Sequence, residues 1–289
     1  MKIKVEAYAK LNLSLDVVGK LENGYHSMRM VMESASLCDD VYMEAVKGGE
    51  TAASTNLPYL PTGGKNIAVK AADLFMEEAG INGYGINIKI NKRIPVCAGL
   101  GGGSSDGAAV LRGMNKLFNA GFSRHELEKM SEKLGSDVPY CVAGGTALAQ
   151  GRGEILEDLP PLPKCYVVIC KPQISFSTPE MFERIDGCKI LRRPDTAGVI
   201  RALEKGDLKG VARRMYNVFE DVIPASGKEI GVIKCGLLDH GAVGAVMSGT
   251  GSASFGLFDS ERSALSAWEN LKQRYKYCYL CETIDRLEI

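Results

Sequence analysis

One glycine-rich stretch has the composition of a phosphate-binding loop. Residues 95–106 are Pro-Val-Cys-Ala-Gly-Leu-Gly-Gly-Gly-Ser-Ser-Asp, with four glycines within five residues. Glycine reaches positive φ and lets a ligand approach the backbone closely. The apolar pattern that follows predicts a helix, whose first turn has free N–H groups and a partial positive charge. The stretch therefore predicts an anion site, with the Ser104 and Ser105 hydroxyls as further donors.

The spacing excludes two common phosphate-binding motifs. No lysine follows the glycines as a P-loop requires, and the acidic residue expected about twenty positions beyond a dinucleotide-binding loop is missing. A plain glycine-rich loop remains the alternative to a phosphate loop of another kind.

Two further positions have side chains suited to phosphoryl or proton transfer. Residues 3–17 alternate apolar and polar, which predicts a strand with one buried face and puts Lys10 and Asn12 together on the other. That pattern alone is equally typical of a solvated face. Asp137 follows Gly135-Ser136 and precedes Val138-Pro139, where the alternative role is to cap a short helix.

The remaining pattern predicts alternating strands and helices. In the first half we expect a returning strand at 25–37, strands at 41–45 and 86–90, and helices at 67–79 and 124–134, besides the helix after the glycines. Residues 159–163 carry three prolines and predict a linker. In the second half we expect strands at 166–170 and 277–284, two strands around the turn 248–252, and helices from Thr178 and at 196–205, 207–216, 225–239 and 260–274.

Composition excludes several classes of function. The 289 residues include 35 Lys and Arg and 35 Asp and Glu, so no basic excess favours nucleic acid or anionic membranes. No apolar run predicts a transmembrane helix, and no signal peptide is visible, so we expect a cytoplasmic protein. Nine cysteines are scattered and predicted to be reduced. Cys278 and Cys281 lack a second pair, and the three histidines lack metal-ligand spacing, so no protein metal site is predicted.

Three separated stretches, at residues 7–13, 95–106 and 247–258, resemble the three motifs of the GHMP small-molecule kinases. Gly24-Tyr25-His26 and residues 135–139 further resemble the branch of this family whose acceptor is cytidine diphosphate methylerythritol. The resemblance implies an α+β fold of two lobes. Residues 1–159 would form a mixed-sheet ATP lobe, and residues 160–289 a sheet-and-helix lobe that completes a substrate cleft.

The same resemblance implies ATP and Mg²⁺ as cofactors and a role for each site residue. Asp137 would act as general base, with Lys10 stabilising its charge and polarising the acceptor hydroxyl. The predicted acceptor-binding residues are Asn12, Tyr25 and Phe182 (stacking on cytosine), His26 (hydrogen bonding its edge), Gly249 and Thr250. The predicted nucleotide-binding residues are Pro95, Val96, Cys97, Ala98, Gly99, Leu100, Gly101, Gly102, Gly103, Ser104, Ser105 and, for adenine, Asn66.

Several alternatives stay open from sequence. Another GHMP kinase, acting on homoserine, mevalonate or a sugar, offers no reason for a Tyr-His pair beside the cleft. A non-catalytic nucleotide-binding module on the same fold is disfavoured by Lys10 and Asp137. The turn 248–252 is either a plain hairpin or a second glycine-rich lip, and helix 178 onward could simply bury Phe182. We expect a monomer or a weak homodimer, with a small-molecule substrate as its partner.

Overall fold

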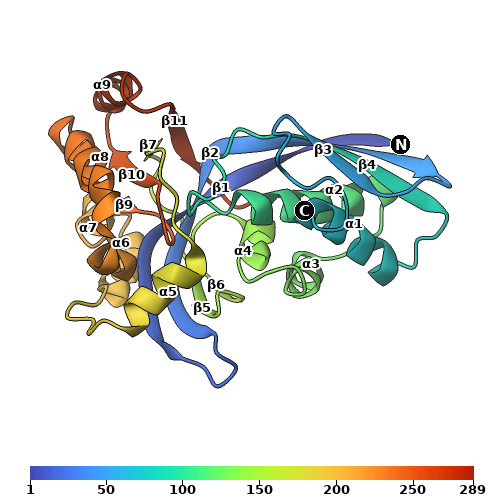
Figure 1. Cartoon of the computed structure of the whole chain (residues 1–289), viewed down its shortest axis with the longest axis horizontal. Coiled ribbons are helices and arrows are strands. Elements are labelled where there is room, and N and C mark those ends of the chain that lie inside the picture. Colours follow the sequence, from blue (N-terminus) through green and yellow to red (C-terminus); the bar gives the residue numbers. More distant parts are fainter.

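The computed structural model describes all 289 residues and shows two lobes joined by one long hairpin. In Figure 1 the hairpin strands β1 (Lys2–Lys20) and β2 (His26–Lys47) run from the first lobe down to a tip beside α5. The remaining elements of the first lobe are β3 (Ala52–Thr55), α1 (Ile67–Glu78), β4 (Tyr84–Asn91), α2 (Gly102–Phe118), α3 (Arg124–Ser131), α4 (Val138–Ala143), β5 (Ala147–Gly151) and β6 (Ile155–Asp158).

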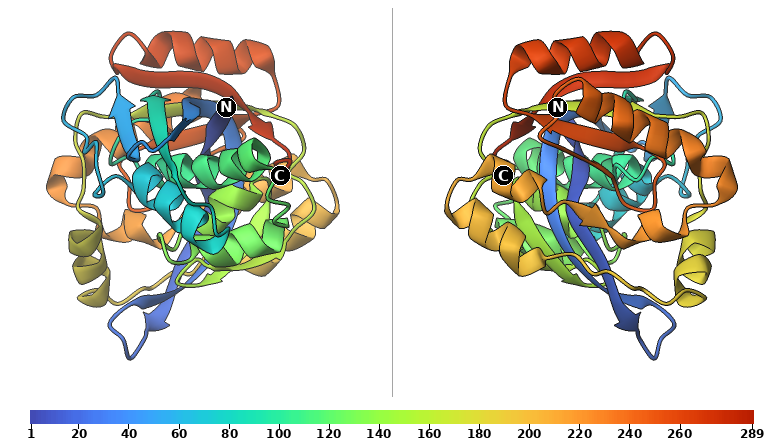
Figure 2. Two further views of the ribbon diagram at one scale, coloured as in Figure 1. Left: turned by 90° about the vertical axis from the view of Figure 1, so that its right-hand side faces the viewer. Right: turned by 90° about the vertical axis from the view of Figure 1, so that its left-hand side faces the viewer.

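The second lobe places strands beside a layer of helices (Figure 2). Its elements are β7 (Tyr166–Lys171), α5 (Thr178–Asp186), α6 (Thr196–Glu204), α7 (Leu208–Ala212), β8 (Tyr216–Asn217), α8 (Lys228–Asp239), β9 (Gly244–Met247), β10 (Ser254–Phe258), α9 (Glu261–Leu271) and β11 (Tyr277–Ile284). The mixed sheet and the separate helical layers confirm the predicted α+β, two-lobed class.

A continuous path of paired strands crosses both lobes in the order β3-β4-β2-β11-β7-β10-β9. Strand β11 pairs with β7 through most of its length and with β2 at Thr283 and Ile284. The Leu287 N–H donates to the Ala143 carbonyl, so the last residues of the chain lie against the first lobe. The predicted boundary at 159/160 stays a prediction, and both β11 and β8, which pairs with β1, link the two halves.

Four expected elements differ from the structure. The predicted strands at 25–37 and 41–45 are one strand, β2, because residues 38–40 continue the regular pairing with β1; the register shift at Tyr8/Ala9 falls earlier, at Ser36 and Leu37. The predicted helix at 207–216 ends at Ala212, because Tyr216 pairs with β1 instead. The predicted helix at 225–239 begins with a 3₁₀ turn, and α8 starts at Lys228.

The polar face of the first strand is not solvated from Lys10 to Ser14, contrary to the alternative given by its pattern. Lys10, Asn12 and Ser14 are buried together with the apolar residues between them. The glycine-rich loop and the turn at 248–252 cover Lys10 and Asn12, as the contacts below show, whereas the Ser14 hydroxyl has no hydrogen-bond partner. Polar residues buried in this way need partners.

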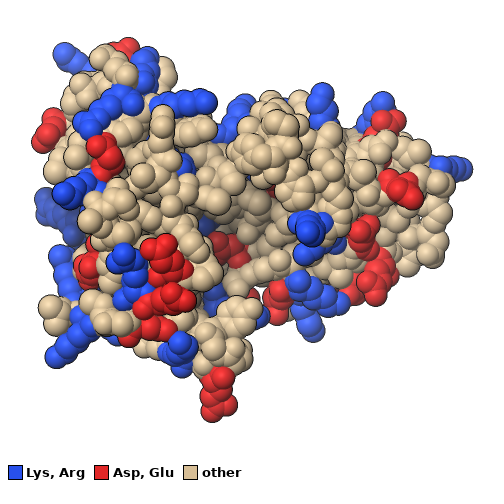
Figure 3. Space-filling model, in the orientation of Figure 1, with Lys and Arg blue, Asp and Glu red and all other residues tan.

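The structure contains no helix long and apolar enough to cross a membrane. On the face shown in Figure 3, Lys and Arg are interspersed with Asp and Glu, in keeping with the balanced composition.

Candidate active site

The glycine-rich loop presents a row of free backbone donors. The N–H groups of residues 99–104 donate no hydrogen bond within the protein, and Ser105 is the first to bond back, to the Gly101 carbonyl. Gly101 precedes α2 with φ +68° and without a side-chain cap, and the first turn of α2 has no acidic residue. Free amides at an uncapped helix start form an anion site.

Two of these glycines are required by close packing. A Cβ on Gly99, whose φ is +75°, would lie 2.0 Å from the Ser248 carbonyl oxygen. A Cβ on Gly101 would lie 2.7 Å from Cγ of Lys10. Any larger residue would therefore displace either the facing turn or the buried lysine.

The turn at 248–252 is hydrogen-bonded to this loop. The Ser248 hydroxyl donates to the Gly99 carbonyl at 2.9 Å, and the Ala253 N–H donates to the Ala98 carbonyl at 3.1 Å. Asn217 donates from its amide to the Gly249 carbonyl at 2.7 Å. Residues far apart in sequence thus hold the loop in one conformation.

Lys10 and Asp137 meet across the mouth of the loop. The Lys10 ammonium lies 3.5 Å from Oδ2 of Asp137 and donates to Oδ1 of Asn12 at 2.8 Å. Lys10 is 4% exposed, and its backbone N–H donates to the Leu100 carbonyl. Asp137 stands at the N-cap position of α4 but makes no capping hydrogen bond, so its carboxylate is available to the cleft.

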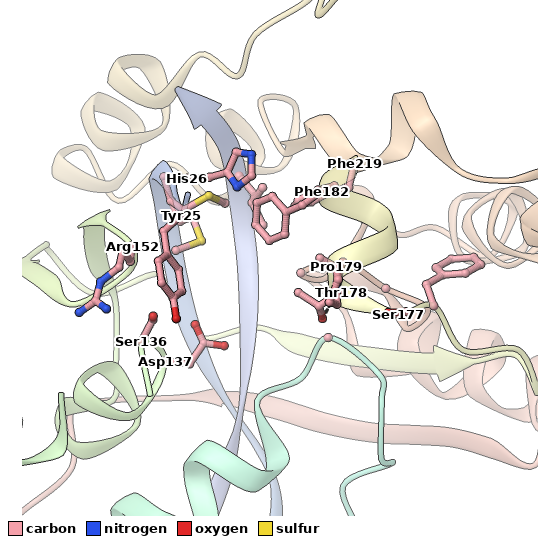
Figure 4. Close-up of a pocket in the computed structure, with 18 of the residues that line it drawn as sticks. Tyr25, His26, Ser136, Asp137, Arg152, Ser177, Thr178, Pro179, Phe182 and Phe219 are labelled. Atoms are coloured by element: carbon pink, nitrogen blue, oxygen red, sulfur yellow. Dashed lines mark hydrogen bonds between the residues drawn. The ribbon is translucent and has the colours of Figure 1, made fainter. Parts of the chain in front are cut away.

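A cleft of about 860 Å³ joins this ion pair to residues of the second lobe. In Figure 4, Tyr25 and Asp137 lie on one side, and Thr178 and Phe182 on α5 lie on the other. The predicted site residues that line the cleft are Lys10, Tyr25, His26, Cys97, Gly99, Gly101, Ser104, Asp137, Phe182, Gly249 and Thr250.

The other predicted residues lie outside this lining. Pro95, Val96, Ala98, Leu100, Gly102 and Gly103 shape the loop or contribute backbone only. The Ser105 hydroxyl donates to the Tyr8 carbonyl and is buried, so the prediction of a second free hydroxyl at the mouth is wrong. Asn66 accepts from the Ala68 N–H and donates to the Pro61 carbonyl, so in the structure its side chain caps α1.

Asn12 supports Lys10 instead of facing the cleft. It is fully buried, and its amide oxygen accepts from both the Lys10 ammonium and the Gly249 N–H. The direct contact of Asn12 with the acceptor stays a prediction. The residue joins the first strand to the second glycine turn and fixes the lysine between them.

An aromatic group forms the far end of the cleft. The His26 ring stacks on Phe182 at 4.4 Å, and Phe182 meets Phe219 edge to face at 5.1 Å. Nε2 of His26 lies 2.7 Å from Asp186, and Lys20 binds the other oxygen of that carboxylate. Lys20 and His26 hold the pKa of Asp186 below its usual value. Tyr25 is 56% exposed, and in Figure 4 its hydroxyl points toward Ser136 and Asp137.

Several residues of the site are absent from the sequence prediction. Arg152 lines the cleft with its guanidinium 5.5 Å from the centre of the Tyr25 ring. Asp186, Asn217 and Ser248 act through other residues, and no local pattern marks them. For Arg152, the turn Gly151-Arg152-Gly153 was visible, but nothing in the sequence placed it beside Tyr25.

Behind the loop lies a buried ion cluster. The Lys92 ammonium contacts both Asp39 and Asp106, the latter at 2.6 Å. Burial raises the pKa of Asp106 to about 7. Asp106 is thus engaged in the interior and does not face the cleft. The structure has no group of three or more His, Cys, Asp or Glu side chains that could hold a metal ion.

Comparison with known proteins assigns two family models to the chain. "GHMP kinases N terminal domain" matches residues 66–145, and "GHMP kinases C terminal" matches residues 199–276. The 4-diphosphocytidyl-2-C-methyl-D-erythritol kinase of Alkaliphilus metalliredigens is 42% identical over 285 residues, covering 99% of this chain and 98% of the relative. The enzyme of the same name from Acetivibrio thermocellus is 43% identical over 282 residues, covering 98% and 99%.

Solved structures show the same likeness. A crystal structure of 4-(cytidine 5'-diphospho)-2C-methyl-D-erythritol kinase superimposes with a TM-score of 0.81 at 32% identity, covering 97% of this chain and 99% of that one. The homoserine kinase from Cytophaga hutchinsonii gives a TM-score of 0.74 at 21% identity, covering 99% and 95%, and shares the fold.

Proposed function

The chain belongs to the GHMP kinases, and on that premise we propose that it transfers the γ-phosphoryl group of ATP to a hydroxyl of 4-diphosphocytidyl-2-C-methyl-D-erythritol. This reaction belongs to isoprenoid precursor synthesis without mevalonate. The observation that carries the proposal is the shared cleft. The Lys10–Asp137 pair and the glycine-rich loop line this cleft together with the aromatic side chains of Tyr25, His26 and Phe182.

Phosphoryl transfer is mostly positioning and charge stabilisation. The free N–H groups of residues 99–104 would bind the β- and γ-phosphate oxygens, aided by the positive end of α2. Because the loop is held by Ser248 and Lys10, these donors need little rearrangement when the donor binds. That preorganisation favours the transition state over free ATP.

Asp137 is proposed as the general base that accepts the proton of the attacking hydroxyl. Its carboxylate faces the cleft and makes no helix-capping hydrogen bond, and the Lys10 ammonium at 3.5 Å stabilises its negative charge. Lys10 is also placed to polarise the hydroxyl or to bind the transferring group. Asn12 is a positioning residue that aims the ammonium.

Mg²⁺ is proposed as the cofactor that neutralises charge on the phosphates when bound. Magnesium at such sites usually keeps several waters and takes one or two protein oxygens in addition to phosphate oxygens. The chain fits that limited demand, because the partly exposed Ser104 hydroxyl and the Asp137 carboxylate both face the cleft. Asp106 is excluded from this role by its buried pairing with Lys92.

For the cytosine ring we propose Tyr25 as one stacking face and Phe182 as the other, with His26 at the ring edge. His26 now covers part of Phe182, so this arrangement requires the His26 ring to move aside or the base to use the remaining face. Residues 1–159 and 160–289 are proposed as the two lobes of the cleft, with Thr250 and Thr178 closing it from the second.

A panel of acceptors tests this assignment. ADP release is measured with ATP and, in turn, the cytidine substrate, homoserine, mevalonate and a hexose. We expect release only with the cytidine substrate. Turnover of another acceptor at a higher kcat/KM would assign the chain to a different GHMP kinase, and no ADP with any acceptor would leave a non-catalytic nucleotide-binding protein.

A further inference from the structure

Arg152 lines the cleft beside Tyr25. It stands at the tip of the turn that joins β5 to β6, where Gly151 has φ +68°. Its guanidinium lies 5.5 Å from the centre of the Tyr25 ring. On the other side, a Cβ on the next residue, Gly153, would lie 3.8 Å from Oδ1 of Asp137. The same turn therefore touches both the aromatic end and the carboxylate (Figure 4).

Arg152 also differs from the other cations in the cleft by its free hydrogen-bonding capacity. Lys10 is held by Asp137 and Asn12, and Lys20 is held by Asp186. The Arg152 guanidinium donates no hydrogen bond to the protein, and its ion partner is Glu154 at 3.5 Å. One oxygen of Glu154 already accepts from the Arg152 backbone N–H. Arg152 thus lines the cleft with its planar fork of donors unpaired, and in Figure 4 its guanidinium lies on the outer side of the Tyr25 ring.

The proposed substrate has an anion in the matching place. A diphosphate links its cytidine to the tetritol that carries the reacting hydroxyl, and each phosphorus carries one negative charge at neutral pH. When cytosine lies at Tyr25 and the hydroxyl at Asp137, the diphosphate passes the turn that touches both. Guanidinium groups bind such oxygens through two parallel hydrogen bonds.

We propose that Arg152 is a specificity-determining residue that binds the diphosphate of the acceptor. This inference rests on the proposed function and deepens it. Arg152 recognises the charged linker, whereas Tyr25 recognises the base. Its contribution belongs to acceptor binding and leaves ATP binding unchanged, because the loop amides of residues 99–104 would hold the phosphates of ATP.

The test is calorimetric titration of the full chain with CDP and with cytidine, while a non-hydrolysable ATP analogue saturates the donor site. Arg152→Ala is expected to weaken CDP by about 10- to 100-fold, the range for hydrogen bonds to charged groups. Cytidine, which lacks the diphosphate, should change by less than about 3-fold, the scale of an exposed cation–π contact. Arg152→Lys should recover part of the CDP affinity, because it keeps the charge and loses the fork.

Arg184→Ala is the matched control, because Arg184 is an exposed arginine of α5 that does not line the cleft. It should bind both ligands like the wild type. Unchanged CDP affinity in Arg152→Ala would overturn the inference. Equal weakening of CDP and cytidine would also overturn it, since Arg152 would then act only by supporting Tyr25.

The proposed function is tested separately by ADP release from the wild type with the cytidine substrate. An active wild type together with unaffected CDP binding in Arg152→Ala overturns the diphosphate contact alone. An inactive wild type overturns the function on which the contact rests.

Discussion

The two ends of the cleft are built in opposite ways. At the phosphate end, the working groups are backbone amides and a lysine that is 4% exposed, held by residues from three distant parts of the chain. At the aromatic end, Tyr25 is 56% exposed at the tip of the β1–β2 hairpin, and the His26 ring stacks on Phe182.

This difference separates two kinds of function. Charge stabilisation needs donors fixed before the substrate arrives, and close backbone packing supplies that rigidity. Recognition of a planar base needs apolar faces that can be covered on binding, and exposed side chains supply those. Substitutions at the phosphate end should therefore change kcat or folding, and substitutions at the aromatic end should change acceptor KM.

The largest expected effect is at the carboxylate. Asp137→Asn removes the proposed base with little change of shape and should lower kcat about 10²- to 10⁴-fold. ATP affinity should change little, because the loop amides are untouched. Steady-state ADP release and titration with an ATP analogue measure the two quantities, and near-normal turnover would refute the assignment of the base.

The next effect concerns the interlocked glycines. Gly99→Ala puts a methyl group 2.0 Å from the Ser248 carbonyl at positive φ, and should cost about 2–5 kcal/mol of unfolding free energy from strain and overpacking. ATP affinity should fall with it. Denaturant unfolding and ATP titration report both quantities.

Gly121→Ala is the matched control for this glycine. Its φ is +77°, but a Cβ there meets nothing within 4 Å, so only the backbone strain of about 1–2 kcal/mol applies. Equal destabilisation by the two variants would show that the loop and the 248 turn are not interlocked.

A smaller effect is expected at the aromatic end. Tyr25→Ala should weaken binding of the cytidine substrate by about 1–3 kcal/mol, the range for stacking of a base on an aromatic ring. Tyr25→Phe should retain the stacking, and Tyr59→Ala, which removes an exposed tyrosine outside the cleft, should have no effect. An unchanged KM for the cytidine substrate in Tyr25→Ala would show that the nucleobase does not stack on Tyr25.

The smallest effect on activity is expected at Glu33, a buried residue of β2, whose titration changes stability instead. Burial raises the pKa of Glu33 to about 8. Since the folded state then binds this proton more tightly than the unfolded chain, the contribution of Glu33 to stability is fully present below about pH 4.3 and is lost as pH rises through about 8. The Thr146 hydroxyl and the Ser34 N–H both donate to the carboxyl.

Glu33→Gln removes the titration, and its amide oxygen can still accept from the Ser34 N–H while its amide nitrogen donates to the Thr146 hydroxyl oxygen. Its unfolding free energy should therefore depend less on pH between 5 and 8, with a gain over the wild type at pH 8. Parallel pH profiles for the two proteins in thermal or urea unfolding would contradict a buried, proton-binding Glu33.

The sequence predicted the main residues of the phosphate-binding end, but not how their side chains are arranged. The glycine spacing and the alternation around Lys10 marked the loop and the lysine, and the family motifs joined them to Asp137. The burial of Asn12 and the inward turn of Ser105 were not visible, because they depend on the second lobe and on β1 covering those side chains. Arg152 was missed because only the folded turn brings it to Tyr25.

The central claim is that one cleft uses its aromatic end to bring the acceptor to Lys10 and Asp137. The most direct measurement compares ADP release with the cytidine substrate and with methylerythritol phosphate, which lacks the cytidine group. We expect a kcat/KM at least about 100-fold higher for the cytidine substrate, as a stacked base and a charged linker together imply. Equal kcat/KM for the two acceptors would contradict it.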